Sequence, residues 1–263
     1  MIGGEIYGDI HKDKWRVLRF SPLTLIVVFF LEFFFMSLVK VTKSNYLVEA
    51  SYNLSLQEQR LILACLSRVD PRSEIPKKVT ISVSDYADMM QMDTKNAHRE
   101  LRKAADKLYD RSIVVSDPEK TQEFRWIQSK AFYHKGEGKA SFTWSDDVLV
   151  YISQLGRCFT SYQLTNVARF NSSYAIRLYE LLMQFISTRD RKINLGDFKS
   201  LFNLSDKYPL FRDLNKWVIK PAVKEINEFS NLDVFYTTVK KGRRVVALQF
   251  DFQEKKFLQL GIS

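Results

Sequence analysis

A basic helix followed directly by a basic β-hairpin, within residues 207–252, constrains the fold of this chain more than any other segment. A helix is predicted over 211–229, because apolar residues recur along one side and cations recur every four residues along the other. Two runs with strand character, 232–239 and 244–252, flank a KKGR turn whose glycine supplies the positive φ of a tight hairpin. Like charges at four-residue spacing repel one another, so an anionic partner such as a DNA backbone is expected.

The net charge of +10 is concentrated in the same part of the chain. Residues 156–263 hold 18 basic and 10 acidic side chains, whereas residues 36–155 hold 18 and 16, and residues 1–35 hold four of each. An even spread would indicate only a generally basic protein. The uneven spread favours a localised surface for an acidic partner.

The hydrophobic content of 46% and aromatic content of 14% predict a packed core rather than disorder. The only cysteines are Cys65 and Cys158. Cys65 lies in an apolar helical run and is expected to be a buried free thiol. Two unrelated cysteines provide neither a disulfide framework nor a zinc site, so a reducing cytoplasm is the expected compartment. We also expect no metal or other cofactor.

The N-terminal segment 1–35 is expected to stand apart from the folded protein. Residues 23–39 are nearly all apolar and follow four basic residues, which is typical of a signal anchor or a short transmembrane helix. Glu32 interrupts the run, at a cost of about 2–3 kcal/mol for insertion. We favour Met36 as the start, with residues 1–35 as upstream sequence read in frame. A membrane anchor and a structured N-terminal extension are the alternatives.

Two consecutive parts of the chain show the same predicted order of elements. The first part is predicted to contain helices over 55–69, 84–90 and 94–108, with strands over 79–83, 113–116, 124–133 and 140–144. The second part is predicted to contain helices over 172–187, 196–202 and 211–229, with a strand over 193–195 and the final hairpin. Matching order predicts an α+β fold of two tandem winged-helix domains related by internal duplication, residues 36–155 and 156–263, joined by a helix over 145–154.

Pro221 interrupts the last predicted helix. An interior proline kinks or breaks a helix, so two shorter helices are one possibility. A bend that lets the first part of the helix enter a groove while the rest packs on the domain is the other.

Three segments, residues 47–63, 172–182 and 221–228, resemble the theta-type, iteron-binding plasmid replication initiators. The resemblance extends over about residues 36–252, and residues 1–35 have no counterpart in it. It implies two winged-helix domains, the C-terminal one reading DNA and the N-terminal one dimerising and adding DNA contacts. It also implies that monomers bind origin iterons in double-stranded DNA and that homodimers bind an operator inverted repeat and repress their own gene. The implied host partners are the initiator ATPase, the replicative helicase and chaperones, with no small-molecule substrate.

The start of the basic helix is where base edges are usually met, so Arg212 and Lys216 are expected to contact bases. Asn215 between them is of a residue type that reads adenine with both ends of its amide, and a surface polar residue without a DNA contact is the alternative. The candidates for phosphate contact in the second domain are Lys207, Tyr208, Lys220, Lys240, Lys241, Arg243 and Arg244. The corresponding candidates in the first domain are Lys95, Arg99, Arg102 and Lys103. A solvated charged surface is the alternative for each cationic group.

Enzyme classes find little support in the sequence. The Gly138-Lys139 pair lacks the residues of a phosphate-binding loop, and the histidines at 11, 98 and 134 are not paired as a metal-assisted nickase requires. Asp146-Asp147, the only adjacent acidic pair, begins a predicted helix, where aspartate is favoured as a cap. The remaining alternatives are a dimeric winged-helix transcription repressor and a membrane-anchored DNA binder.

Overall fold

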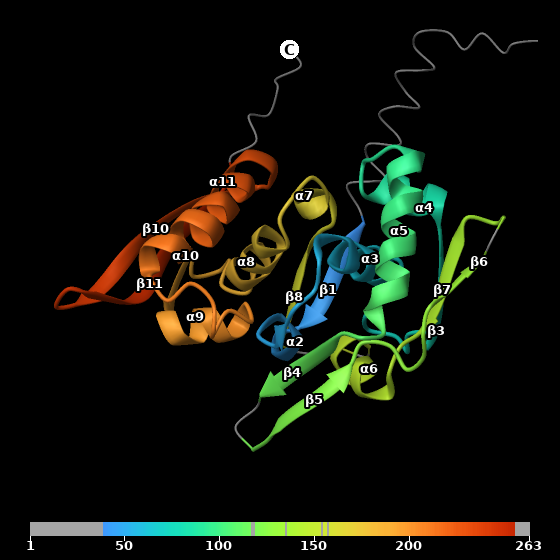
Figure 1. Cartoon of the computed structure of the whole chain (residues 1–263), viewed down its shortest axis with the longest axis horizontal. Helices are drawn as coiled ribbons and strands as arrows, with labels where there is room; N and C mark the ends of the chain where they lie inside the picture. The colour runs from blue at the N-terminus through green and yellow to red at the C-terminus, as the bar shows by residue number, and fades with distance from the viewer. Residues whose placement is uncertain (1–38, 117–118, 135, 154, 157, 256–263) are drawn as a thin grey trace, which may run out of the picture. The chain divides into compact units, whose positions relative to one another are not determined.

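The computed structural model describes residues 39–116, 119–134, 136–153, 155–156 and 158–255 (Figure 1). The expectations for residues 1–35 and for nearly all of the apolar run 23–39 therefore lie outside the described residues. Among the residues described, no helix is both long and apolar enough to cross a membrane.

The first half of the structure begins with β1 (Lys40–Ser44), α2 (Asn45–Val48) and β2 (Ser51–Tyr52). The first group of three helices and a strand is α3 (Leu56–Leu66), β3 (Lys78–Ser82), α4 (Val83–Met89) and α5 (Thr94–Leu108). Local signals set their starts. Ser55 and Glu58 form a capping box at α3, and the Asp93 side chain accepts from the Asn96 backbone at α5.

The prediction of one strand over 124–133 was wrong. The structure has β4 (Ser112–Ser116), β5 (Thr121–Arg125), β6 (Phe132–His134) and β7 (Lys139–Thr143), which form the sheets β2-β4-β5 and β3-β7-β6. Between β5 and β6 the buried Trp126 and Ile127 leave the first sheet, and Ile127 makes an isolated bridge to Trp144. The chain thus changes its pairing partner between the two strands, where the polar residues Gln128, Ser129 and Lys130 interrupt the apolar ones.

The second half repeats the order of the first (Figure 1). After α6 (Asp146–Ile152), β8 (Phe159–Gln163) and α7 (Thr165–Ala168) come α8 (Ser173–Met183), β9 (Asp190–Asn194) and α9 (Leu195–Leu201). A continuous helical stretch follows as α10 (Phe211–Leu214), the π-helical segment η1 (Asn215–Ile219) and α11 (Lys220–Phe229). The hairpin β10 (Leu232–Lys241) and β11 (Arg244–Glu254) pairs with β9 in the order β10-β11-β9. The prediction of a tandem winged-helix fold is confirmed.

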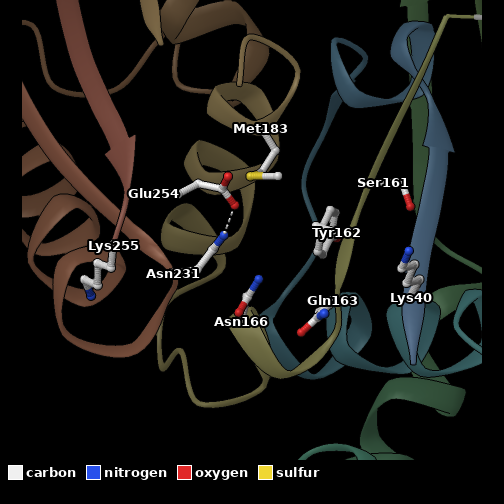
Figure 2. A pocket seen from close by; sticks show the side chains of 9 residues that line it. All are labelled: Lys40, Ser161, Tyr162, Gln163, Asn166, Met183, Asn231, Glu254 and Lys255. Atoms are coloured by element: carbon white, nitrogen blue, oxygen red, sulfur yellow. Dashed lines mark hydrogen bonds between the residues drawn. The ribbon is translucent and has the colours of Figure 1, made fainter. Parts of the chain in front are cut away.

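The two halves are joined by β1, which pairs antiparallel with β8 from Lys40 opposite Gln163 to Ser44 opposite Phe159. A cleft of about 490 Å³ lies between this pair and the end of β11, lined by Tyr162, Asn166, Asn231, Glu254 and others (Figure 2). At the cleft, Asn166 Nδ2 donates to the Tyr179 hydroxyl at 3.0 Å, and that hydroxyl donates to Asn231 Oδ1 at 2.8 Å. Asn231 Nδ2 then donates to Glu254 Oε1 at 2.9 Å. The cleft therefore borders a hydrogen-bonded connection from α7 to the hairpin.

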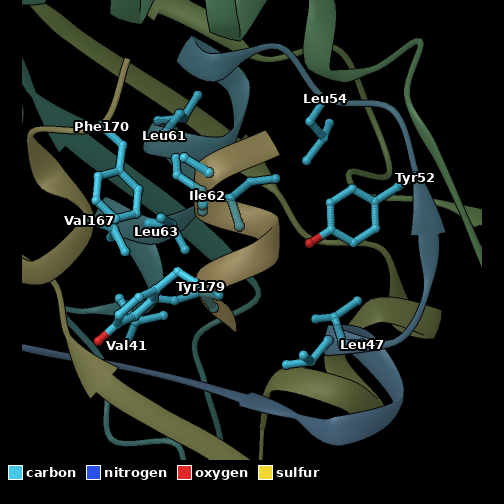
Figure 3. Packing of buried hydrophobic residues seen from close by; sticks show 14 of the residues in the cluster. Val41, Leu47, Tyr52, Leu54, Leu61, Ile62, Leu63, Val167, Phe170 and Tyr179 are labelled. Carbon is cyan, nitrogen blue, oxygen red and sulfur yellow. The ribbon is translucent and has the colours of Figure 1, made fainter. Parts of the chain in front are cut away.

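One hydrophobic core runs through both halves (Figure 3). Leu61, Ile62 and Leu63 of α3 pack in the same cluster as Phe170 and Tyr179 from the second half. Trp126 and Trp144 belong to this core, because both are almost fully buried. Phe132, in contrast, is 64% exposed. Burial of apolar surface is the main stabilising contribution, and both halves share this core. We therefore expect the two halves to unfold together.

The two cysteines should differ sharply in reactivity. Burial raises the pKa of the Cys65 thiol to about 12, whereas Cys158 is exposed and free. Only thiolates react with disulfide reagents, so at about pH 8 the folded protein should expose one reactive thiol, at Cys158. Titration of the native and the unfolded protein with an aromatic disulfide reagent checks this. Equal modification of both thiols in the native protein would contradict it.

Candidate nucleic-acid interface

The stretch α10–η1–α11 presents a cationic side to solvent. Leu214, Val218 and Ala222 face the core as predicted, while Phe211 and Phe229 pack against its edge. The exposed cations along the stretch are Arg212, Lys216, Lys220 and Lys224. The sequence therefore identified both sides of this helix correctly.

Pro221 lies in the first turn of α11, directly after the π-helical segment. Because the helical stretch is continuous here, the missing N–H of Pro221 removes one helical hydrogen bond, and a π-helical irregularity is typical of such a position. The Lys220 N–H bonds to the Asn215 carbonyl, five residues back, so this turn holds more residues than an α-turn. The stretch stays helical instead of separating into two helices. Its wider turn offsets Lys220 and Lys224 from Arg212 and Lys216, so a spacing of four residues does not give one straight row.

Asn215 is tied to the hairpin. The Tyr236 hydroxyl on β10 donates to Asn215 Oδ1 at 2.6 Å. Burial raises the pKa of Tyr236, so the hydroxyl stays protonated and remains a donor. The bond orients the Asn215 amide and leaves its Nδ2 and one lone pair of Oδ1 to meet a base edge.

Trp217 is an exposed residue of this surface that the sequence analysis did not identify. Its side chain is 58% exposed, and Lys216 Nζ lies 4.5 Å from its ring centroid. A cation over an indole face is a favourable contact. The sequence feature that could have identified Trp217 is its position outside the apolar side of the predicted helix.

The hairpin tip is cationic and projects from the sheet (Figure 1). Lys240, Lys241, Arg243 and Arg244 are all exposed, and Gly242 has the expected positive φ of 62°. A register shift between Val239 and Lys240 precedes the tip. In the turn before α10, Lys207 is exposed, whereas Tyr208 is half-buried and its carbonyl accepts from Lys199 Nζ at 2.9 Å.

The hairpin tip, residues 240–244, is the wing of the second half, and we expect it to bind DNA through its charge alone. Lys241→Ala should weaken binding to specific and non-specific DNA equally and reduce the slope of log affinity against log salt by about one, because one phosphate contact releases about one counterion. Fluorescence anisotropy over a salt series measures both effects. Lys192→Ala, an exposed lysine of β9 away from the tip, is the control and should leave the slope unchanged. A loss confined to one DNA sequence would contradict a phosphate role for Lys241.

The first half presents a similar but less basic surface. Lys95, Arg99, Arg102 and Lys103 of α5 are exposed, while Ala97, Leu101, Ala104, Ala105 and Leu108 face the core. Arg99 Nη2 donates to Asn96 Oδ1 at 2.6 Å. The β6–β7 hairpin lies beside α5, as β10–β11 lies beside α11 (Figure 1).

The cleft at β8 gathers amides and hydroxyls, and the described residues contain no group of three side chains suited to hold a metal.

A cationic helix beside a β-hairpin, present twice in one chain, defines the tandem winged-helix class. Residues 40–183 match the family described as "Initiator Replication protein, WH1", and residues 194–252 match "Initiator Rep protein, WH2". The chain therefore belongs to the family of initiator replication proteins.

Two proteins of Escherichia coli and a solved structure resemble this chain. The chain is 30% identical over 236 residues to a replication initiation protein of Escherichia coli, a match that covers 86% of this chain and 73% of the relative. It is 28% identical over 221 residues to an uncharacterised 27.6 kDa protein of Escherichia coli, covering 78% and 92%. Among solved structures, the Pi initiator protein in complex with iteron DNA superposes with a TM-score of 0.72 at 21% identity, covering 84% of this chain and 99% of that one. That structural likeness concerns the fold.

Proposed function

We propose that this protein initiates plasmid replication by binding, as a monomer, the repeated iterons of an origin in double-stranded DNA. The observation that carries the proposal is the surface of the second half, where the exposed start of a basic helix lies beside a basic wing. In this proposal Arg212, Lys216 and Asn215 meet base edges in the major groove. The cationic wing tip at 240–244 and Lys207, Tyr208 and Lys220 meet phosphates.

The first half contributes auxiliary contacts through Lys95, Arg99, Arg102 and Lys103 and forms the homodimer. The division into domains at 36–155 and 156–263 is part of the same proposal, with β1 and β8 pairing across it. A dimer bound to an inverted repeat represses the gene of the protein. The host initiator ATPase, replicative helicase and chaperones act as partners, and the chain itself performs no catalysis. Family membership supports these assignments, and the Pi initiator gives a precedent for this fold on iteron DNA.

A dimeric transcription repressor is the second candidate, because the same fold and charge suit an operator palindrome. The DNA next to the gene separates the two. We expect a nuclease footprint of the purified protein to cover tandem direct repeats of about 20 base pairs, because equal orientation on one face of DNA requires spacing by whole helical turns. Protection of a lone palindrome, with no repeats, would instead establish the repressor.

The role of residues 1–35 is tested in the same system. A chain that begins at Met36 is expected to support replication from the origin as well as the full chain does. Loss of replication with the shorter chain, despite normal DNA binding, would give the N-terminal segment a function.

A further inference from the structure

Arg60 of α3 connects the two halves through a buried guanidinium group. Its Nη1 donates to both carboxylate oxygens of Glu100 on α5, at 3.1 and 3.2 Å. Its Nη2 donates to the carbonyls of Phe170 at 2.8 Å and Ala168 at 3.4 Å, in the segment that leads from α7 to α8. The side chain of Arg60 is 8% exposed and that of Glu100 is 17% exposed. A single side chain thus joins the basic helix of the first half to the segment before α8.

The connection continues to the basic helix of the second half. Glu225 of α11 accepts from the backbone N–H groups of Asn171 at 2.9 Å and Ser172 at 3.1 Å, immediately after Phe170. Between them, the Arg169 guanidinium lies 4.7 Å from the ring centroid of Phe229, also on α11. Every step from Glu100 to Glu225 is therefore a hydrogen bond or part of one short backbone segment.

The hydrogen bonds of this connection fix the orientation of one half relative to the other, whereas the apolar contacts of the surrounding core do not. Apolar contacts between α3 and Phe170 stabilise the association but tolerate small rotations, because burial of apolar area is non-directional. A planar guanidinium donates to a carboxylate on one side and to carbonyls on the other. It therefore tolerates much less rotation of one half against the other. The burial of Arg60 is also costly, because among the described residues its Nε has no hydrogen-bond partner. A side chain selected for stability alone would be better replaced by an apolar one.

We propose that Arg60 is a positioning residue that fixes the placement of α5 relative to α11, so that both basic helices meet one DNA segment in register. This inference rests on the proposed function in so far as it concerns DNA. Its geometric part, the fixed relation of the two helices, stands independently.

The first experiment measures that geometry without DNA. Spin labels are attached at Lys103→Cys on α5 and Lys224→Cys on α11 in a Cys158→Ser background, because Cys65 is buried and both lysines are exposed. Arg60→Lys keeps the charge but loses the fork, so the distance distribution between the labels should broaden or shift. Arg68→Lys is the matched control, because Arg68 pairs with Asp85 inside the first half. It should leave the distribution unchanged.

The second experiment measures the consequence for DNA. Inserting two base pairs between the segments protected by the two halves rotates one against the other by about 70°. The wild type should lose about tenfold in affinity on this DNA because one half loses its phosphate contacts. Arg60→Lys should lose less than about threefold on the same insertion, since its halves can reorient before they bind. A general loss of stability would not alter this ratio.

The possible outcomes distinguish a failure of the positioning role of Arg60 from a failure of the proposed function. An unchanged label distance in Arg60→Lys, or an equal change in Arg68→Lys, overturns the inference whatever the DNA shows. If Arg60→Lys fails to unfold cooperatively, Glu225→Gln takes its place, since it weakens the other end of the connection and keeps the side-chain shape. A changed distance in a protein that binds no origin DNA leaves the positioning role intact and counts against the proposed function. If the two-base-pair insertion lowers the affinity of Arg60→Lys by as much as that of the wild type, Arg60 does not hold the two basic helices in register on DNA.

Discussion

Replacing Glu180 by glutamine is expected to destabilise the fold by about 3–5 kcal/mol, the cost of leaving buried charges without their partner. Glu180 Oε1 accepts from Lys43 Nζ and from the Tyr162 hydroxyl, both at 2.5 Å, and Arg177 Nη1 lies 3.6 Å from Oε2. The side chains of all three charged residues are at most 4% exposed. Glutamine keeps the shape and removes the negative charge. Denaturant unfolding followed by circular dichroism measures the loss.

The same carboxylate predicts a pH dependence. Burial by itself raises the pKa of Glu180, but the charges of Lys43 and Arg177 outweigh it and hold the pKa below the ordinary 4.5. A lowered folded pKa contributes stability that is complete above the unfolded value and is lost as pH falls through the folded value. The free energy of unfolding of the wild type should therefore decrease below about pH 4.5 more steeply than that of Glu180→Gln.

Glu74→Gln, at an exposed glutamate, is the control for both measurements and should match the wild type. A Glu180→Gln protein within about 1 kcal/mol of the wild type would mean that water reaches the cluster and compensates Lys43 and Arg177.

This cluster also marks where reasoning from the sequence ends. Arg177 and Glu180 are three residues apart in a helix, a spacing typical of an exposed pair, and nothing local shows that both are buried. Their burial follows from β1, which brings Lys43 next to α8 by pairing with β8. Arg60 is a similar case, because its carbonyl partners lie more than a hundred residues away along the chain. Partners this distant leave no periodicity in the sequence.

Features set by neighbouring residues were predictable. The capping box at Ser55, the amphipathic sides of 211–229 and the glycine turn at 242 each depend on a few adjacent side chains, and all three are present. The order of elements in both halves followed from such local signals, and with it the tandem fold. The π-helical segment did not follow, because the choice between bonding four or five residues back depends on how the helix packs around Pro221. The exposure of Trp217 on this segment, in contrast, could be predicted, because this aromatic residue lies outside the apolar side of the predicted helix.

The expected result with the largest effect on DNA binding concerns Arg212. Its side chain is 82% exposed, and its closest described partner is Asp213, with Nε 3.4 Å from Oδ1, a weak contact that leaves the guanidinium fork available. If the fork meets a guanine, Arg212→Ala should reduce affinity for the footprinted site by roughly tenfold to a hundredfold and affinity for unrelated DNA much less. Arg212→Lys should restore little, because an ammonium group cannot donate two parallel hydrogen bonds. Competition binding against variant sites measures the specificity ratio.

Lys224→Ala sharpens that test, because Lys224 has the charge and exposure of the proposed reading residues but lies beyond the π-helical turn. That turn offsets the second pair of cations from the first, so a helix entering the groove with Arg212 and Lys216 directs Lys224 elsewhere. Specificity should therefore fall with Arg212→Ala and remain with Lys224→Ala. If both variants lower specific and non-specific affinity by the same factor, the whole row meets only phosphates. Sequence reading would then have to come from another surface, of which α5 is the first to examine.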